Sequence, residues 1–436
     1  MKLIPIFIFF LISFSQSTIR RSRRSRHGED CVSDAACEEG LVCKTNRCFT
    51  EYEASHLSIL GLEEKNICNL QKKCHGNLVC YQHRCIDSLL AKEYAKPQPQ
   101  VNPDEEEDIS MIFSGSISLN KLAYLSGLNS DKTFNYDHLF QHVTNFIKHA
   151  DVSIARQESL FYINPAQSQF KPDHKNIPKE LGNAVANAGF STVLHATTNA
   201  YNRLDAGIVN TLSFWKNEHP KIQVLGISKT EQMENDYYIY EKNGVKIAII
   251  DFATKLSKSL PKTKKYMVNI ISKEKIEQIM NKLKGQADFF VACVDWGVKS
   301  EKKPTKNQIY LSKLLIANGV NLIVGNQPDY IQPVSYVKAS NGNCGLVFFS
   351  LGQFIGEGKG RLGAFAHVVI TKDKTHTYIS SYSLRPTINH NIESKEYTVY
   401  RLPTYTQELA NLAKKKINVL KLRKICKKLM GAFAYC

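Results

Sequence analysis

The sequence lacks a long apolar run after its first residues, and it is short of acidic side chains. A membrane-spanning helix needs about 20 consecutive apolar residues, and no stretch beyond the N-terminal one approaches that length, so we expect a soluble mature chain without a transmembrane segment. The 40 Asp and Glu residues are outnumbered by 57 Lys and Arg residues, which gives a net charge of +17. This balance fits a lysine-rich secreted protein or one that binds an anionic polymer or surface. We expect no nucleic-acid partner.

Two short sequence motifs that mark metal-binding or catalytic sites are also absent. No Cys-x2-Cys pair occurs, which argues against a compact zinc module. No Gly-x-Ser-x-Gly elbow occurs, so the chain has no nucleophilic serine of the kind that this turn presents. The absence of these two motifs therefore argues against a compact zinc module and against a serine nucleophile on such a turn.

The first residues have the pattern of a secretory signal. Lys2 is followed by an apolar run and then by small and polar residues, which predicts a signal peptide over 1–18 and a secreted, extracellular or cell-surface location. A cluster of arginines follows within 19–30. We interpret it as a basic processing segment, with a simple basic arm as the alternative.

Eight of the 12 cysteines form two matching sets with the spacing C-x5-C-x5-C-x4-C, repeat 1 at 31–48 and repeat 2 at 68–85. Each repeat is too small to bury a core, so we expect disulfides to stabilise both, as is usual in exported proteins. Four cysteines allow three pairings, and the sequence does not choose among them. The cysteines concerned are Cys31, Cys37, Cys43, Cys48, Cys68, Cys74, Cys80 and Cys85.

The remaining four cysteines do not belong to a repeat. Cys293 lies in an apolar strand and Cys344 in a turn, and we expect no bridge between them. Cys426 and Cys436 are close enough in sequence to pair.

Composition divides the rest of the chain into three parts. Prolines and a run of acidic residues mark 96–110 as an extended linker. Residues 111–385 are the predicted main domain, and 386–436 a basic C-terminal extension. Within the extension, 409–430 is expected to be one basic helix, which either packs on the domain or contacts an anionic surface.

The main domain has alternating strand and helix signals, which predict an α/β fold with mixed sheets because the last strands follow one another without helices. Helical periodicity fits 138–149, 178–188, 206–216, 273–284 and 306–318. Strand-like runs occur at 111–118, 151–155, 191–195, 222–226, 235–241, 245–251, 288–295, 320–325, 334–338, 345–350, 364–371 and 376–382.

Six short motifs occur in a fixed order along this domain. They include Asp-Trp-Gly at 295–297, Gly-Asn-Gln-Pro-Asp-Tyr-Ile-Gln-Pro at 325–333 and Ser-Leu-Gly-Gln-Phe-Ile at 350–355, and the others lie at 113–117, 155–158 and 200–207. Together they resemble the motifs of the CapA family of poly-γ-glutamate capsule synthesis proteins. The resemblance implies a calcineurin-like metallophosphatase fold, a four-layer α/β/β/α sandwich.

The positions that the resemblance implies for metal ligands and catalysis are mostly substituted. Ser116 stands for an aspartate, and Asn202, Asp295, Gln327 and Asp329 stand for histidines, whereas Glu158 is retained. Residues of the framework, such as Trp296, Gly297, Gln308, Pro328 and Gln332, are kept. We therefore expect a degenerate site at Ser116, Glu158, Asn202, Asp295 and Asp329, and we assign no catalytic residue.

A site without histidines does not suit zinc, so we expect no cofactor. The alternative is a hard cation, calcium, magnesium or manganese, held by Glu158, Asp295 and Asp329. Otherwise Asp295 and Asp329 fill the old site through hydrogen bonds to neighbouring amides or to Arg156 and Arg203. His195, at the end of a strand, is expected to be a structural hydrogen-bonding residue.

Three functions follow from these observations. The first is a secreted, catalytically inactive CapA-like protein that binds an anionic partner, either a polyanionic glycan or an acidic polypeptide. The second is a residual divalent-metal-dependent hydrolase that acts on an anionic polymer or a phosphoester. The third is a structural wall or matrix protein anchored by its cysteine-rich repeats. The sequence does not indicate an oligomeric state.

Overall fold

The computed structural model describes residues 107–161, 177–233, 236–356, 362–392, 396–413 and 417–430, with the backbone of four short strands before them. The chain separates into two units, Met1–Val101 and Asn102–Cys436. The predicted signal peptide and processing segment lie outside the described residues, as do the bonds of the repeat cysteines. In the part that is described, none of the helices is long and apolar enough to cross a membrane.

In the first unit each cysteine repeat contains one antiparallel hairpin, formed by β1 (Leu41–Lys44) with β2 (Arg47–Thr50) and by β3 (Leu78–Tyr81) with β4 (Arg84–Asp87). The pairing register is the same in both, with Cys43 opposite Cys48 and Cys80 opposite Cys85. The duplication in sequence is thus accompanied by a duplicated backbone pairing. The disulfides stay a prediction.

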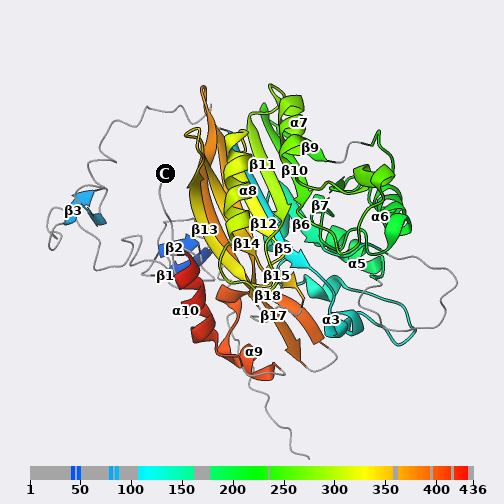
Figure 1. Ribbon diagram of the computed structural model, residues 1–436. Helices are drawn as coiled ribbons and strands as arrows, with labels where there is room; N and C mark the ends of the chain where they lie inside the picture. The colour runs from blue at the N-terminus through cyan, green and yellow to red at the C-terminus, as the bar shows by residue number, and fades with distance from the viewer. Residues whose placement is uncertain are drawn as a thin grey trace, which may run out of the picture. The chain divides into compact units, whose positions relative to one another are not determined.

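The second unit contains two mixed sheets (Figure 1). A six-stranded sheet has the order β13-β14-β12-β11-β10-β9, and an eight-stranded sheet has the order β18-β17-β16-β5-β6-β7-β8, with β15 (Gln353–Ile355) beside β5. The strands of the first are β9 (Tyr237–Lys242), β10 (Val245–Ala253), β11 (Phe289–Asp295), β12 (Leu322–Asn326), β13 (Ile331–Lys338) and β14 (Cys344–Leu351). Those of the second are β5 (Glu107–Ile117), β6 (Val152–Gln157), β7 (Thr192–Leu194), β8 (Gln223–Leu225), β16 (Leu362–Lys372), β17 (Thr377–Ile392) and β18 (Glu396–Arg401).

Helices cover the outer face of each sheet. One apolar core lies between the sheets, with side chains such as Met111 and Val291 from both, and two further cores lie under the helices. The six-stranded sheet carries α7 (Lys273–Leu283) and α8 (Lys306–Ala317), and the eight-stranded sheet carries α3 (Lys121–Ser126), α4 (Thr144–Lys148), α5 (Glu180–Asn187) and α6 (Leu204–Glu218). This α/β/β/α layering confirms the predicted fold class.

Two predicted helices differ from the structure. The helix expected at 138–149 is a 3-10 turn, η4 (Asp137–Leu139), followed by α4, although its apolar side chains are buried as expected. The helix expected at 409–430 is divided into α9 (Gln407–Leu412) and α10 (Val419–Met430), because Ala413 has an extended backbone with ψ of 138°.

The boundary predicted after residue 385 falls inside β17, which continues to Ile392 and pairs with β18. Both strands belong to the eight-stranded sheet, so the sheet extends well into the predicted C-terminal extension. At the N-terminal end of the domain, β5 begins at Glu107, within the predicted linker. Cys293 and Cys344 are free thiols, which confirms that they do not form a bridge.

The motif residues that resemble a framework form one buried network at the start of α8. Gln308 caps this helix together with Thr305, and its amide nitrogen donates to Gln332 Oε1 at 2.8 Å. Gln332 in turn donates to the carbonyls of Glu301 and Lys303. Gly297 has φ of +81°, and a Cβ there would lie 2.8 Å from Gln308 Oε1, so glycine is required beside this amide. The network fixes the loop between β11 and α8.

We predict that Gln332→Ala lowers the free energy of unfolding by about 2–4 kcal/mol, because it leaves two loop carbonyls unpaired, removes one acceptor of the Gln308 amide and opens a cavity. Gln286→Ala is the control, since Gln286 donates to the Lys282 carbonyl at an exposed site and its loss should cost less than about 0.5 kcal/mol. Urea denaturation of both variants gives the comparison. Equal losses would show that the network does not stabilise the loop.

Candidate functional site

The candidate site lies where parallel strands of both sheets end. The eight-stranded sheet contributes the ends of β5, β6 and β7, and the six-stranded sheet contributes those of β10, β11 and β12. Open α/β sheets place their ligand sites at these carboxyl ends. Most polar side chains here are buried, so each needs a partner within the protein.

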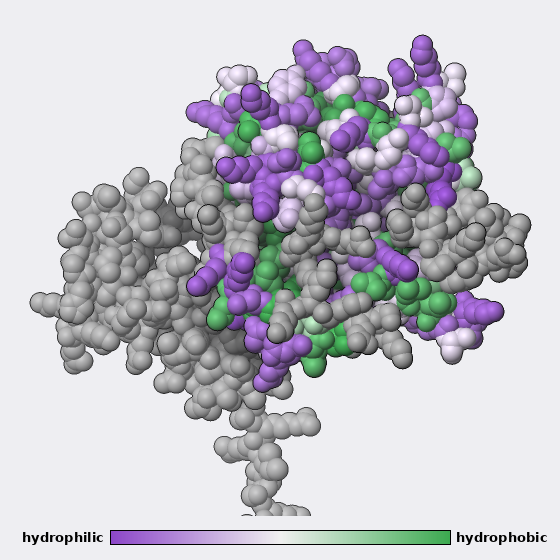
Figure 2. All heavy atoms as spheres, turned by 60° about the horizontal axis from the view of Figure 1, so that its bottom comes forward, coloured by the Kyte–Doolittle hydropathy of each residue, from purple (hydrophilic) through white to green (hydrophobic). Residues whose placement is uncertain are grey.

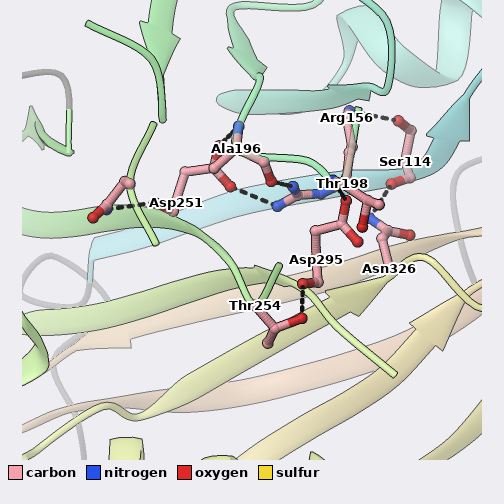
Figure 3. Close-up of polar contacts among 9 residues, drawn as sticks. Ser114, Arg156, Ala196, Thr198, Asp251, Thr254, Asp295 and Asn326 are labelled. Atoms are coloured by element: carbon pink, nitrogen blue, oxygen red, sulfur yellow. Dashed lines mark hydrogen bonds and ion pairs between the residues drawn. The ribbon is translucent and has the colours of Figure 1, made fainter. Parts of the chain in front are cut away.

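The centre of the site is an ion pair between Arg156 on β6 and Asp251 on β10 (Figure 3). The guanidinium donates to Asp251 Oδ1 at 2.6 Å and to the carbonyl of Ala196 at 2.8 Å. Asp251 Oδ2 accepts from the amide of Ala196 at 2.8 Å. The side chains are only 1% and 0% exposed. Because β6 and β10 belong to different sheets, the pair connects the two sheets across the core.

Asp295, at the end of β11, points toward the loop that follows β7 (Figure 3). Its Oδ2 atom accepts from the amide of Thr198 at 2.7 Å, and its backbone carbonyl accepts from Thr254. Its Oδ1 atom accepts no hydrogen bond from any described residue. Asp295 therefore bonds to a neighbouring amide, one of the two arrangements expected from the sequence, whereas Arg156 pairs with Asp251 instead.

Glu158 and Asp329 meet at a single amide. The Gln353 side-chain nitrogen donates to Glu158 Oε1 at 3.3 Å and to Asp329 Oδ1 at 3.1 Å. Gln353 lies on β15, opposite Ser116 of β5. A neutral amide donor thus lies between two carboxylates that the sequence assigned to a cation site.

Of the other predicted positions, Ser116 joins this cluster through a side-chain hydrogen bond to Glu158, whereas Asn202 bonds elsewhere. Ser116 is buried, and its backbone amide donates to the carbonyl of Gly352. Asn202 donates to Asn199 Oδ1 at 3.0 Å, in the loop before α6. Gln327 has the unusual φ of +96°, and in the orientation that satisfies its amide it donates to the carbonyls of Gly297 and Trp296. His195 accepts from Trp215 Nε1 at 3.0 Å, which confirms its structural role.

Burial raises the pKa of three acids of this site, because the nearby positive charge does not offset their desolvation. Desolvation raises the pKa of Asp295 to about 7, although the nearby Arg156 charge opposes the shift. It raises the pKa of Asp251 to about 6, again against the effect of Arg156. It also raises the pKa of the partly buried Glu158, which hydrogen bonds from Ser116 and Gln353 counteract. The single guanidinium of Arg156 does not offset this desolvation, so burial favours a proton on Asp295 near neutral pH.

The described side chains do not fit the two-metal centre that the fold family implies. A centre of this kind needs several carboxylate and imidazole ligands around each ion. Within the described ranges, no group of three or more His, Cys, Asp or Glu side chains is placed to hold a metal ion. Asp295 is turned to Thr198, and Gln353 bridges the other two carboxylates. The set Glu158, Asp295 and Asp329 is therefore not arranged as one ligand shell.

Two residues of the site were missed from the sequence. Asp251 ends the predicted strand 245–251, and a carboxylate at a strand end was an available signal. Gln353 lies in a motif that was identified, but its bridging role depends on β15 lying beside β5, a strand that was not predicted.

Comparison with known proteins places most of this domain in one group. Residues 102–357 match the family model described as bacterial capsule synthesis protein PGA_cap. The capsule biosynthesis protein CapA of Bacillus anthracis is 24% identical over 280 residues, which cover 61% of this chain and 65% of that protein. The PGA biosynthesis protein CapA of Bacillus subtilis is 24% identical over 260 residues, 59% and 66% of the two chains. The chain thus spans slightly less than two thirds of these relatives.

Solved structures with similar layering are more distant. The NAD nucleotidase NadN of Haemophilus influenzae gives a TM-score of 0.42 at 12% identity, over 74% of this chain and 60% of that one. The calcineurin-like phosphoesterase YfkN from Bacillus subtilis gives 0.37 at 12% identity, over 74% and 97%. At these values no functional residue is transferred from them.

We predict that Asp295→Asn reduces the pH dependence of stability between pH 8 and 5.5. The folded protein takes up a proton on Asp295 as the pH falls through about 7, whereas the unfolded chain does so near its ordinary value of 3.8. Lowering the pH across this window therefore stabilises the unaltered protein, by about 2 kcal/mol from this group. The variant should lose this gain and should be the more stable of the two at pH 8.

Asp131→Asn is the matched control for this measurement. Hydrogen bonds from Thr133 hold the pKa of the exposed Asp131 carboxyl below its ordinary value, so it stays ionised throughout the window. Denaturant titrations at several pH values compare the three proteins. A parallel pH dependence for Asp295→Asn and the unaltered protein would contradict a buried, protonated Asp295.

Proposed function

Since the chain belongs to the PGA_cap family of bacterial capsule synthesis proteins, we propose that it is a member whose domain binds an anionic polymer and does not hydrolyse one. The observation that carries the proposal is that the acids of the site are held by the chain's own side chains. Arg156 pairs with Asp251, and Gln353 donates to both Glu158 and Asp329. A water activated by two metal ions has no equivalent in this arrangement.

The net charge of +17 supports an anionic partner. Hydrophilic side chains predominate over the coloured part of the face in Figure 2, which suits a charged ligand better than an apolar one. The relative named a PGA biosynthesis protein, together with the resemblance to poly-γ-glutamate capsule synthesis proteins, favours an acidic polypeptide over a glycan. The partner that we propose is therefore a polyglutamate-like chain.

The proposal includes a location outside the cell or at its surface. It rests on the signal-like pattern of residues 1–18 and on the two cysteine repeats, whose disulfides an exported protein would form. No cofactor is needed for binding of this kind.

Binding to poly-γ-glutamate across a salt series tests this function. We expect the dissociation constant to rise on the order of tenfold or more between about 0.05 M and about 0.5 M salt, since exposed charges are screened over shorter distances at higher salt. A neutral polyamide of similar length is the control ligand and should not bind. Failure to bind at any salt concentration, or binding that salt does not weaken, would remove this class of partner.

A residual metal-dependent hydrolase is the second candidate, and the buried Asp295 Oδ1 atom, which accepts no hydrogen bond from any described residue, favours it. Our proposal predicts no turnover of generic phosphoesters or γ-glutamyl peptides with added magnesium, manganese or calcium. Glu158→Gln separates a true activity from a contaminant, because it removes one carboxylate at nearly constant shape. Turnover that needs added metal and disappears in this variant would establish the hydrolase instead.

A further inference from the structure

The segment between β10 and α7 is a basic stretch beside the site. Residues 254–272 contain Lys255, Lys258, Lys262, Lys264 and Lys265, and no acidic residue. Such a run is ordinarily a solvated surface with no role beyond solubility. Here, however, the segment also encloses a cavity, which a simple charged surface does not.

The cavity has a volume of about 590 Å³, within the range of pockets that bind small molecules. Lys255, Lys265 and Lys275 line it together with the apolar side chains of Leu256, Leu260 and Ile270. It therefore combines positive charge with walls that suit methylene groups. It is separate from the acids of the candidate site, none of which lines it.

Two of the three lysines are available to a ligand. Lys275 Nζ lies 2.5 Å from Asp236, the one acidic residue among those that line the cavity. Lys255 and Lys265 are exposed, and neither ammonium has a partner in the part of the chain that the structure describes. The cavity thus presents two uncompensated positive charges to solvent.

Hydrogen bonds to backbone carbonyls connect the segment that lines the cavity to the candidate site. Thr254 donates to the carbonyl of Asp295, and the amide of Ser257 donates to the carbonyl of Thr198 at 2.8 Å. Asn269, which also lines the cavity, donates from Nδ2 to the carbonyl of Asp251 at 2.6 Å. The lysines therefore extend from an anchored loop, which lowers the conformational entropy that a ligand must restrict.

We propose that this cavity binds carboxylates of an acidic polyamide chain, with Lys255 and Lys265 as the contacting cations. The inference rests on the proposed function and names the site where it takes place. Lysine ammonium groups bind carboxylates and phosphates alike, so the choice of a polycarboxylate over a polyphosphate follows from the apolar part of the cavity lining. The leucine and isoleucine side chains of the wall are matched to the methylene groups between the carboxylates.

The test is the double charge reversal Lys255→Glu and Lys265→Glu, assayed by fluorescence anisotropy with labelled poly-γ-glutamate. We expect the dissociation constant to rise by about tenfold or more, because like charges then face the ligand. The control is Lys306→Glu with Lys313→Glu on α8, which makes the same change in net charge at exposed positions away from the cavity. It should change the dissociation constant by less than about threefold, as expected of remote, screened charges.

A neutral double variant and a competing ligand separate the alternative outcomes. Lys255→Gln with Lys265→Gln should weaken binding in the same direction but less, and circular dichroism confirms that each variant is folded. Inorganic polyphosphate serves as a competitor and should displace poly-γ-glutamate poorly. Equal losses in both charge-reversed proteins would overturn the cavity while leaving the proposed function standing. No binding by the unaltered protein would overturn the proposed function itself, and strong competition by polyphosphate would overturn the choice of carboxylates.

Discussion

A single buried guanidinium is the constraint on which the site depends. Arg156 and Asp251 come from different sheets, and their ion pair is almost fully excluded from solvent. Desolvating two charges is costly, and removing one partner of such a pair typically destabilises a protein by about 3–5 kcal/mol. The two sheets must therefore keep the alignment that brings these side chains together. Asn326 of β12, which donates to the carbonyl of Ser114 on β5, crosses the same interface.

The positive charge of Arg156 also decides how the neighbouring acids behave. In a metal-bound site, cations would balance several carboxylates at once. Here one guanidinium faces Asp251 directly and Asp295 through space, and Glu158 raises the pKa of Asp295 further. Gln353 satisfies Glu158 and Asp329 without adding charge. Burial raises the pKa of Asp251 and Asp295, and hydrogen bonds satisfy Glu158 and Asp329, so these acids are accommodated where the described side chains do not form a metal shell.

The layers of the fold could be predicted from the sequence because strand and helix periodicities are local. The framework motif at Trp296 and Gly297 could be predicted as well, since the backbone needs glycine beside Gln308. It did not indicate that Arg156 would choose Asp251 over Asp295, because both acids end neighbouring strands and only the register decides which one the guanidinium reaches. The helix expected at 409–430 was divided because Ala413 is extended, a conformation that alanine's helix propensity does not foretell.

The buried acids and the exposed lysines differ in charge and in exposure, but hydrogen bonds connect the segments that carry them. The loop that carries Lys255 is hydrogen-bonded to Asp295, and Asn269, which also lines the cavity, is hydrogen-bonded to the carbonyl of Asp251. The strands that carry the buried acids are therefore hydrogen-bonded to the segment that lines the cavity. In our proposal, these hydrogen bonds support a binding surface beside the buried acids, and Lys255 and Lys265 contribute its positive charge.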